Sequence, residues 1–131
     1  MAFHEVRVGD DTGSFPYVPL WDVAANFIRI AFQSSIQNYH AADRLLEHFF
    51  DAGLPDPHLF CEKLVGGNAD SPLYGWLAEL LQSLQPQLDR MRIILSETFT
   101  MEGFESRLRD AVVEARSQVF GPAQVCAWAR L

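Results

Sequence analysis

Two loops of this sequence carry the side chains whose types and spacing could do chemistry. In the first loop, His4-Glu5 and Arg7 end an N-terminal run of alternating residues, and Asp10 and Asp11 follow. Ligands of open α/β sheets bind beyond the carboxyl ends of strands, so these carboxylates could face a small-molecule substrate. The alternative is a solvated turn, because Gly, Asp, Ser and Pro are the residue types that turns favour.

The second loop begins with Gly66-Gly67 and leads to Pro72. Adjacent glycines let a ligand approach the backbone closely, and the helix that follows offers unpaired N–H donors at its start. The alternative is a strand-to-helix turn that only caps and packs. Trp21, Tyr74 and Trp76 lie near the two loops and could wall an apolar pocket, although aromatic residues at helical spacing also form cores.

Other site chemistry is poorly supported by the spacing of residues. The sequence contains no zinc-protease, phosphate-loop or nucleophile-elbow motif. His40 and His48 could share a helix face, but His40 falls at a helix break, so no metal site is expected. We expect Cys61 and Cys126 to be buried free thiols of a protein in a reducing cytoplasm. No catalytic residue is assigned.

Length and charge narrow the class of protein further. The 131 residues carry a formal net charge of −7, and we expect residues 1–131 to form a single domain. An acidic surface disfavours nucleic acids and anionic membranes as partners. Arg29 interrupts the longest apolar run, and residues 1–5 show no signal-peptide pattern, so we expect no membrane contact and a cytoplasmic location.

Hydrophobic spacing predicts an α/β fold of about three strands and about four helices. Strands are expected at 2–8, 58–65 and 118–130, with the last strand bent or divided at Gly121-Pro122. Because helices separate the strands in sequence, a layered α/β sheet is the expected architecture. Three strands make a thin sheet for four helices, which suggests an incomplete fold.

The four helices are expected at regions of 3.6-residue periodicity. They run from Pro19 through Phe32, over 43–52, from about 72 to 91, and from Thr98 or Thr100 through Ala115. Pro86 could kink or divide the third helix. The second helix should turn Leu45, Leu46, Phe49 and Phe50 inward and end at Gly53.

Four stretches carry a resemblance to a known family. Met1 to Glu5 is similar to a strand that reads apolar-Ala-Phe-Gln-Glu, and residues 64–76 are similar to a Val-Gly-Gly-Gly-x-Asp-Ser-Pro-x-Tyr-x-Trp stretch. A third match, over residues 45–55, is to a helix that leads into the next strand. A fourth, over residues 108–110 with 127–130, is to a last helix and a last strand. Together they resemble the C-terminal half of class I S-adenosylmethionine-dependent methyltransferases, in particular bacterial small-molecule members.

The resemblance implies a partial Rossmann-like fold with the family's fifth, sixth and seventh strands. It implies S-adenosylmethionine as the cofactor, but the glycine-rich loop that binds this cofactor is absent from the sequence. Methyl transfer depends on positioning cofactor and acceptor together, so this chain, as a segment or a truncated product, is expected not to be catalytic alone. The residues expected on its substrate side are Glu5, Asp10, Trp21, Gly66, Gly67, Tyr74 and Trp76.

A half-fold of this kind leaves the edge of its first strand unpaired. Bare strand edges pair readily with other chains, so we expect a homodimer through the N-terminal strand or the first helix. A stand-alone dimeric module that binds a partner or an apolar small molecule is the alternative function. A small helical binding protein without the expected sheet is a third, weaker hypothesis.

Overall fold

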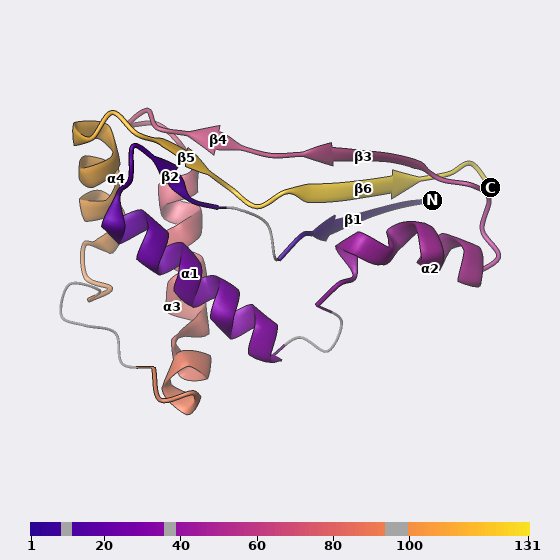
Figure 1. The fold of residues 1–131 in the computed structure, drawn as a ribbon, viewed down its shortest axis with the longest axis horizontal. Coiled ribbons are helices and arrows are strands. Elements are labelled where there is room, and N and C mark those ends of the chain that lie inside the picture. The colour runs from indigo at the N-terminus through magenta and orange to yellow at the C-terminus, as the bar shows by residue number, and fades with distance from the viewer. Residues whose placement is uncertain (9–11, 36–38, 94–99) are drawn as a thin grey trace.

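Over the residues that the structure describes, the protein is a mixed α/β fold with four helices and two small antiparallel sheets of three strands each (Figure 1). The computed structural model describes residues 1–8, 12–35, 39–93 and 100–131. The expected α/β class is confirmed, and the helical hypothesis without a sheet is wrong. The strands are more numerous than expected, because two of the predicted strands are each divided between the two sheets and a further strand forms at Ser14–Phe15, where none was expected.

The first sheet is formed by β1 (Ala2–Val6), β6 (Gln124–Trp128) and β3 (His58–Glu62), in the order β1-β6-β3. The central strand β6 runs antiparallel to both neighbours, and its Trp128 pairs with Ala2 on one side and His58 on the other. Strands β1 and β3 are therefore parallel to each other. The last strand of the chain thus holds the first sheet together.

The second sheet is formed by β2 (Ser14–Phe15), β5 (Gln118–Phe120) and β4 (Val65–Gly66), in the order β2-β5-β4. Figure 1 shows that β3 leads into β4, and β5 into β6, along the length of the molecule. The predicted division of the last strand at Gly121-Pro122 is confirmed. Proline has no N–H to donate to a sheet ladder, so the strand breaks there.

Three helices pack together beside the second sheet and form the larger core. They are α1 (Pro19–Ser35), α3 (Leu73–Arg90) and α4 (Phe104–Glu114). Their fully buried residues include Trp21, Tyr74, Leu81, Leu108 and Val112. We call this part the helical lobe.

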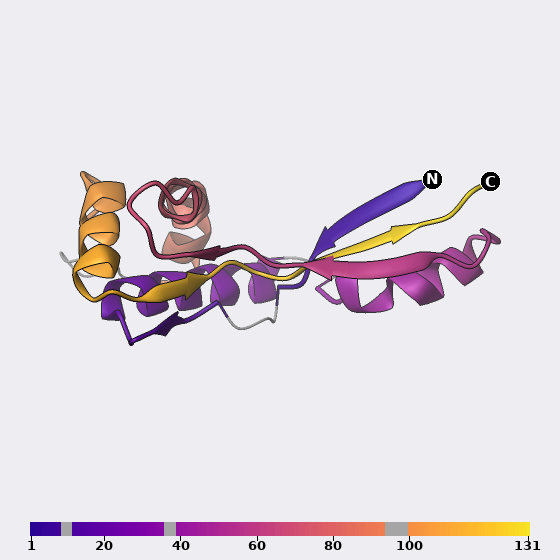
Figure 2. The same ribbon diagram turned by 90° about the horizontal axis from the view of Figure 1, so that it is seen from above.

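The fourth helix, α2 (Leu45–Asp51), follows a short 3₁₀ turn at Ala42–Arg44 and packs on the first sheet (Figure 2). Leu45 and Phe49 contact Ala127 and Ala129 in a separate, smaller core. Leu46 and Phe50 are exposed, so the expectation that they point inward is wrong. A seven-residue helix resting on one face of a sheet buries one narrow stripe, and these two residues lie outside it.

The end of α2 follows the prediction from Gly53. Gly53 adopts a left-handed conformation with φ of +67°. Its N–H donates to the Phe50 carbonyl at 3.0 Å, and the Leu54 N–H donates to the Phe49 carbonyl at 2.9 Å. This pair of bonds is the Schellman motif, which satisfies the last carbonyls of a helix.

Three other expectations need correction. Helix α4 begins at Phe104 after the left-handed Gly103, whereas Thr100 precedes the helix and Thr98 lies outside the described residues. Pro86 does not divide α3, because buried leucines on both sides of the proline, Leu81 and Leu88, hold its two halves in one core.

The third correction concerns the two thiols. Cys61 is exposed on the edge strand β3, and Cys126 is half-buried on β6, so neither is the buried thiol that we expected. All five residues of β3 are exposed, because α2 covers only part of one face of the sheet. Partial burial raises the pKa of the Cys126 thiol, which favours the protonated, unreactive form.

Candidate functional site

A pocket of about 410 Å³ lies where the end of β1 meets helices α1 and α3. We call it the β1 pocket. This volume falls in the range of small-molecule sites, about 300–1,000 Å³. Most of its walls are apolar. The lining residues are His4, Glu5, Val6, Val8, Thr12, Ala25, Ile28, Arg29, Phe32, Tyr39, Ala41, Trp76, Leu77, Leu80 and Pro122.

Two charged side chains of the β1 pocket, Glu5 and Arg29, differ in their hydrogen-bond partners. The carboxylate of Glu5 is half-buried and has no ion-pair or hydrogen-bond partner in the described part of the chain. The guanidinium of Arg29 donates to the Gln33 side chain at 3.1 Å and to the Asn26 side chain at 2.7 Å. The acceptors of Glu5 are therefore left for a bound molecule, whereas Arg29 already has partners on its own helix.

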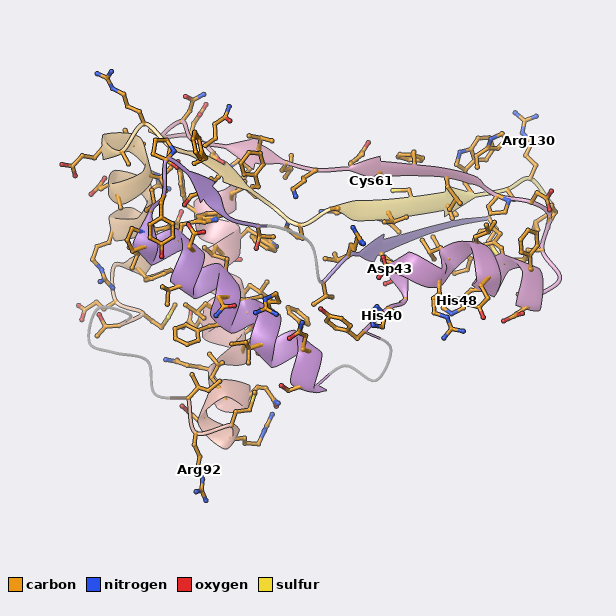
Figure 3. All side chains as sticks on the ribbon, viewed as in Figure 1. His40, Asp43, His48, Cys61, Arg92 and Arg130 are labelled. Atoms are coloured by element: carbon orange, nitrogen blue, oxygen red, sulfur yellow. The ribbon has the colours of Figure 1, made fainter. Side chains whose placement is uncertain are left out.

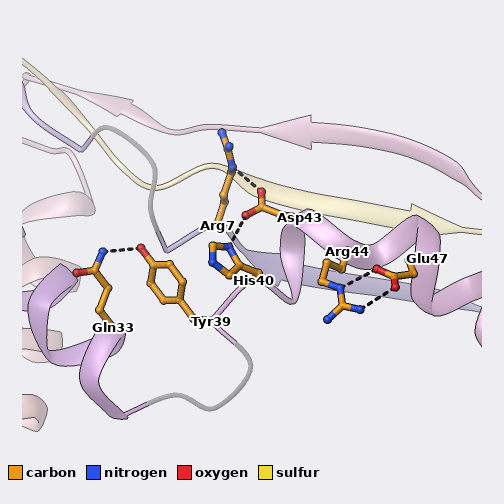
Figure 4. A network of polar contacts seen from close by, with 7 residues as sticks. All are labelled: Arg7, Gln33, Tyr39, His40, Asp43, Arg44 and Glu47. Atoms are coloured by element: carbon orange, nitrogen blue, oxygen red, sulfur yellow. Dashed lines mark hydrogen bonds and ion pairs between the residues drawn. The ribbon is translucent and has the colours of Figure 1, made fainter.

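A chain of polar contacts borders the pocket and connects α1 to the end of β1 (Figure 4). The Gln33 side chain donates to the Tyr39 hydroxyl at 2.7 Å, and the Tyr39 ring meets the His40 ring edge-on at 4.8 Å. His40 Nδ1 lies 3.2 Å from one oxygen of Asp43, and Arg7 Nε donates to the other at 2.8 Å. These contacts fix Tyr39, which lines the pocket.

The electrostatic consequence falls on Asp43. Hydrogen bonds from His40 and then Arg7 hold the pKa of its carboxyl below the ordinary value of 3.8. A carboxyl whose pKa is lower in the folded state than in the unfolded state stabilises the fold above its unfolded pKa. That stabilisation disappears as the pH falls through the lowered value.

Among the residues expected at the site, Glu5 and Trp76 both line the β1 pocket. Trp21 and Tyr74 do not line it, because both are fully buried in the helical lobe. Their rings pack edge-on with centroids 6.5 Å apart. Trp21 acts on the pocket indirectly, since its indole N–H donates to the Thr12 carbonyl at 2.6 Å and Thr12 is part of the lining. Asp10 lies outside the described residues.

The Tyr74 hydroxyl is the one buried side-chain polar atom without a partner among the described residues. Burial raises its pKa, so the phenol is neutral at physiological pH. The Arg109 guanidinium lies 5.5 Å from the centre of the Tyr74 ring, and this cation–π contact holds the ring in the core. Tyr74 is thus a core residue.

Gly66 and Gly67 serve packing, which is the alternative noted for this loop. A Cβ on Gly66 would collide with the Ser71 hydroxyl, and a Cβ on Gly67 would lie 2.6 Å from the Ser117 carbonyl. The space beside both glycines is therefore filled by this chain. The Ser71 hydroxyl accepts the Leu73 N–H at 3.3 Å just before α3, whose N-cap position is occupied by Pro72.

Sequence reasoning missed several lining residues, notably Arg29 and Tyr39. A signal existed for part of this wall: Ala25, Ile28 and Phe32 recur at helical spacing and share one face of α1. The spacing identifies an apolar face, but it does not tell whether that face meets another helix completely or leaves a hollow. Tyr39 follows a helix break, and only the contact with Gln33 places it at the pocket.

The β1 pocket is suited to binding rather than to covalent chemistry. Among the lining residues that the structure describes there is neither serine nor cysteine. His4 and Glu5 are consecutive strand residues, so their side chains leave opposite faces of β1 and do not form an acid–base pair. Across the described residues, no group of three or more His, Cys, Asp or Glu is placed to hold a metal ion. Figure 3 shows His40 at the junction before α2 and His48 on that helix.

Comparisons with protein-family models, curated proteins and solved structures found no match to this chain. Among the described helices, none has both the length and the apolarity needed to cross a membrane.

We predict that Gly67→Ala destabilises the fold more than Gly53→Ala. Both glycines have positive φ, but only the new methyl group at position 67 would meet a backbone carbonyl, whereas position 53 has open space. The expected losses in unfolding free energy are about 1–2 kcal/mol at Gly53 and about 2–4 kcal/mol at Gly67. Urea unfolding followed by circular dichroism measures both, and equal losses would mean that the Gly66-Gly67 turn is not packed as described.

We predict that Asp43→Asn removes part of the acid sensitivity of the protein. The wild type should lose stability as the pH falls below about 4, because Asp43 must then be protonated. The contacts of Asp43 with Arg7 and His40 are largely exposed, so the loss in free energy of unfolding should stay below about 1 kcal/mol. Unfolding midpoints at neutral and acidic pH measure it, with Asp56→Asn as the control. An acid sensitivity that is identical in Asp43→Asn and wild type would contradict the assignment.

Proposed function

We propose that this chain is the substrate-side half of a class I S-adenosylmethionine-dependent methyltransferase, with the methyl acceptor held in the β1 pocket. The main support for this proposal is the strand order β1-β6-β3, in which the central strand runs antiparallel to both neighbours. In the class I methyltransferase fold, the last strand runs opposite to the others and lies between the fifth and sixth. The order and direction seen here support that equivalence, and so do the stretches similar to this family.

The uncovered face of the first sheet supports the same proposal. The side chains opposite α2 include Val6, Phe60 and Trp128, which are 45%, 47% and 38% exposed. The free edge of β1 has no strand partner among the described residues. Sheets of Rossmann-like folds are covered on both faces. A cofactor-binding half would supply both the missing neighbour of β1 and the missing cover of this face.

The described residues do not fit the cofactor that the family uses. A nucleoside cofactor needs a glycine-rich turn with open space beside its backbone. The turn at Gly66-Gly67 is filled by Ser71, Leu73 and Ser117. We therefore assign this chain no step of methyl transfer, and only binding and orientation of the acceptor by the β1 pocket.

The source DNA in front of the Met1 codon tests this proposal directly. An in-frame segment that encodes a strand, a glycine-rich loop and a helix is the expected result. An in-frame stop codon followed by a ribosome-binding site would overturn the proposal and favour a separate protein.

Calorimetry of the chain with S-adenosylmethionine gives a second readout. We expect no heat of binding at high micromolar concentrations, because the cofactor cradle is outside this chain, and the same for S-adenosylhomocysteine. After the chain is joined to the upstream segment, both should bind one-to-one. One-to-one binding to the chain alone would contradict the division of labour proposed here.

A stand-alone dimeric binding module is the second candidate. The same free edge of β1 favours it, because two copies of this strand can pair into one continuous sheet. The first helix is a weaker route to a dimer, since Trp21, Ala24 and Ala31 on α1 are already buried within the lobe.

Light scattering coupled to size-exclusion chromatography tests the dimer. The wild type should have twice the chain mass of 14.8 kDa. Val6→Lys places a charge on the exposed side of β1 and should shift the protein to the monomer. Leu46→Lys, on the exposed side of α2, is the matched control and should remain dimeric. A wild type that elutes as a 14.8 kDa monomer at high concentration would rule the dimer out.

A further inference from the structure

The unpartnered carboxylate of Glu5 is the feature of the β1 pocket that calls for a ligand group. Glu5 is half-buried beside apolar side chains, and none of the described residues donates to its oxygens. The Glu5 oxygens are not among the buried side-chain atoms of the described residues, so they stay accessible in the pocket and can accept a hydrogen bond from a bound molecule. A bound molecule with an O–H or N–H group directed at Glu5 would supply the missing donor.

The remaining walls specify the body of that molecule. The apolar lining includes two residues of α1, Ile28 and Phe32, and two residues of α3, Trp76 and Leu80. Trp76 is 36% exposed, so its indole offers a flat surface to a ligand. Stacking against an indole favours a planar aromatic ring. A volume of about 410 Å³ accommodates one or two fused rings.

The charges of the lining select a neutral molecule. The carboxylate of Glu5 opposes a bound anion, and the guanidinium of Arg29, in the same lining, opposes a bound cation. The nitrogen atoms of Arg29 that donate to Gln33 and Asn26 are occupied by side chains of α1. An acidic group on the ligand would meet the like charge of Glu5, and a basic group would meet the like charge of Arg29, so a neutral molecule avoids both repulsions.

We infer that the β1 pocket binds a small, neutral aromatic molecule that carries a hydroxyl or amine and donates a hydrogen bond to Glu5. The role of this molecule as methyl acceptor rests on the proposed function. Its binding does not, because the residues on which the inference rests, Glu5 and Trp76 above all, are described residues of this chain.

Fluorescence titration of the full chain with two matched probes tests the inference. 1-Naphthol carries the ring and the donor, and 1-methoxynaphthalene carries the same ring with the donor blocked. We expect 1-naphthol to bind about tenfold more tightly, the effect of one hydrogen bond to a charged acceptor. 1-Naphthoate, an anion of the same ring, should bind most weakly of the three.

Variants assign the site of binding. Glu5→Leu should remove the preference for 1-naphthol over its methyl ether, and Glu5→Gln, which retains one acceptor oxygen, should keep an intermediate preference. Trp76→Phe should remove most of the fluorescence change, whereas the matched control Trp128→Phe, on the uncovered sheet face, should keep it. Circular dichroism checks that each variant is folded.

Three results would overturn the inference: no probe binds, the anion binds most tightly, or Glu5→Leu leaves the preference for 1-naphthol unchanged. The titration contains no cofactor, so its outcome is independent of the upstream DNA. Donor-dependent binding without an upstream cofactor segment would leave the ligand class standing and remove the methyltransferase role. An upstream cofactor-binding segment together with no donor-dependent binding would leave the methyltransferase role standing and remove the ligand class.

Discussion

Insertion of the last strand between the first and third is the interaction on which the rest of the structure depends. β6 provides every inter-strand bond of the first sheet, because β1 and β3 each pair with it and not with each other. The N-terminal amine extends this pairing by donating to the Ala129 carbonyl at 2.8 Å. This sheet also presents Ala127 to Leu45 and Phe49 of α2. Without β6, neither the sheet nor the smaller core would exist.

The position of the β1 pocket follows from that arrangement. β6 fixes the end of β1, and the polar contacts from Arg7 through Asp43 and His40 to Tyr39 connect this end to the region after α1. The pocket therefore lies between a sheet and a lobe that have separate cores. Sites commonly form where two packed units meet, since side chains there are shared incompletely. Among the described lining residues at this junction, Glu5 is the one carboxylate.

The helices and strands were largely predictable from sequence because their signals are local. Gly53 as a left-handed helix end and the break at Gly121-Pro122 depend on backbone properties of single residues. The exposure of Leu46, Phe50 and Cys61 was not predictable, because it depends on how much of a face another element covers.

In the candidate site, too, some residues were predictable from the sequence and others were not. Glu5 and Trp76 were identified from their positions near strand and helix ends, and both line the pocket. Trp21 and Tyr74 are aromatic residues near the starts of helices, as Trp76 is, yet they are buried within the helical lobe. Arg29 and Tyr39 become part of the lining only through the tertiary arrangement of α1 and β1. Residue type alone does not separate a core aromatic side chain from a pocket aromatic side chain.

The pairing of Ala2 with Trp128 also constrains the order in which this chain can fold. A ribosome delivers β1 before its partner β6, so the first sheet cannot form until β6 has been synthesised. The helical lobe draws its buried side chains from α1, α3, α4 and β5, all of which precede β6. Contacts between distant residues form slowly, since a long loop must close before they stabilise anything. The lobe can therefore assemble first, while β1 and β3 remain unpaired until β6 is made.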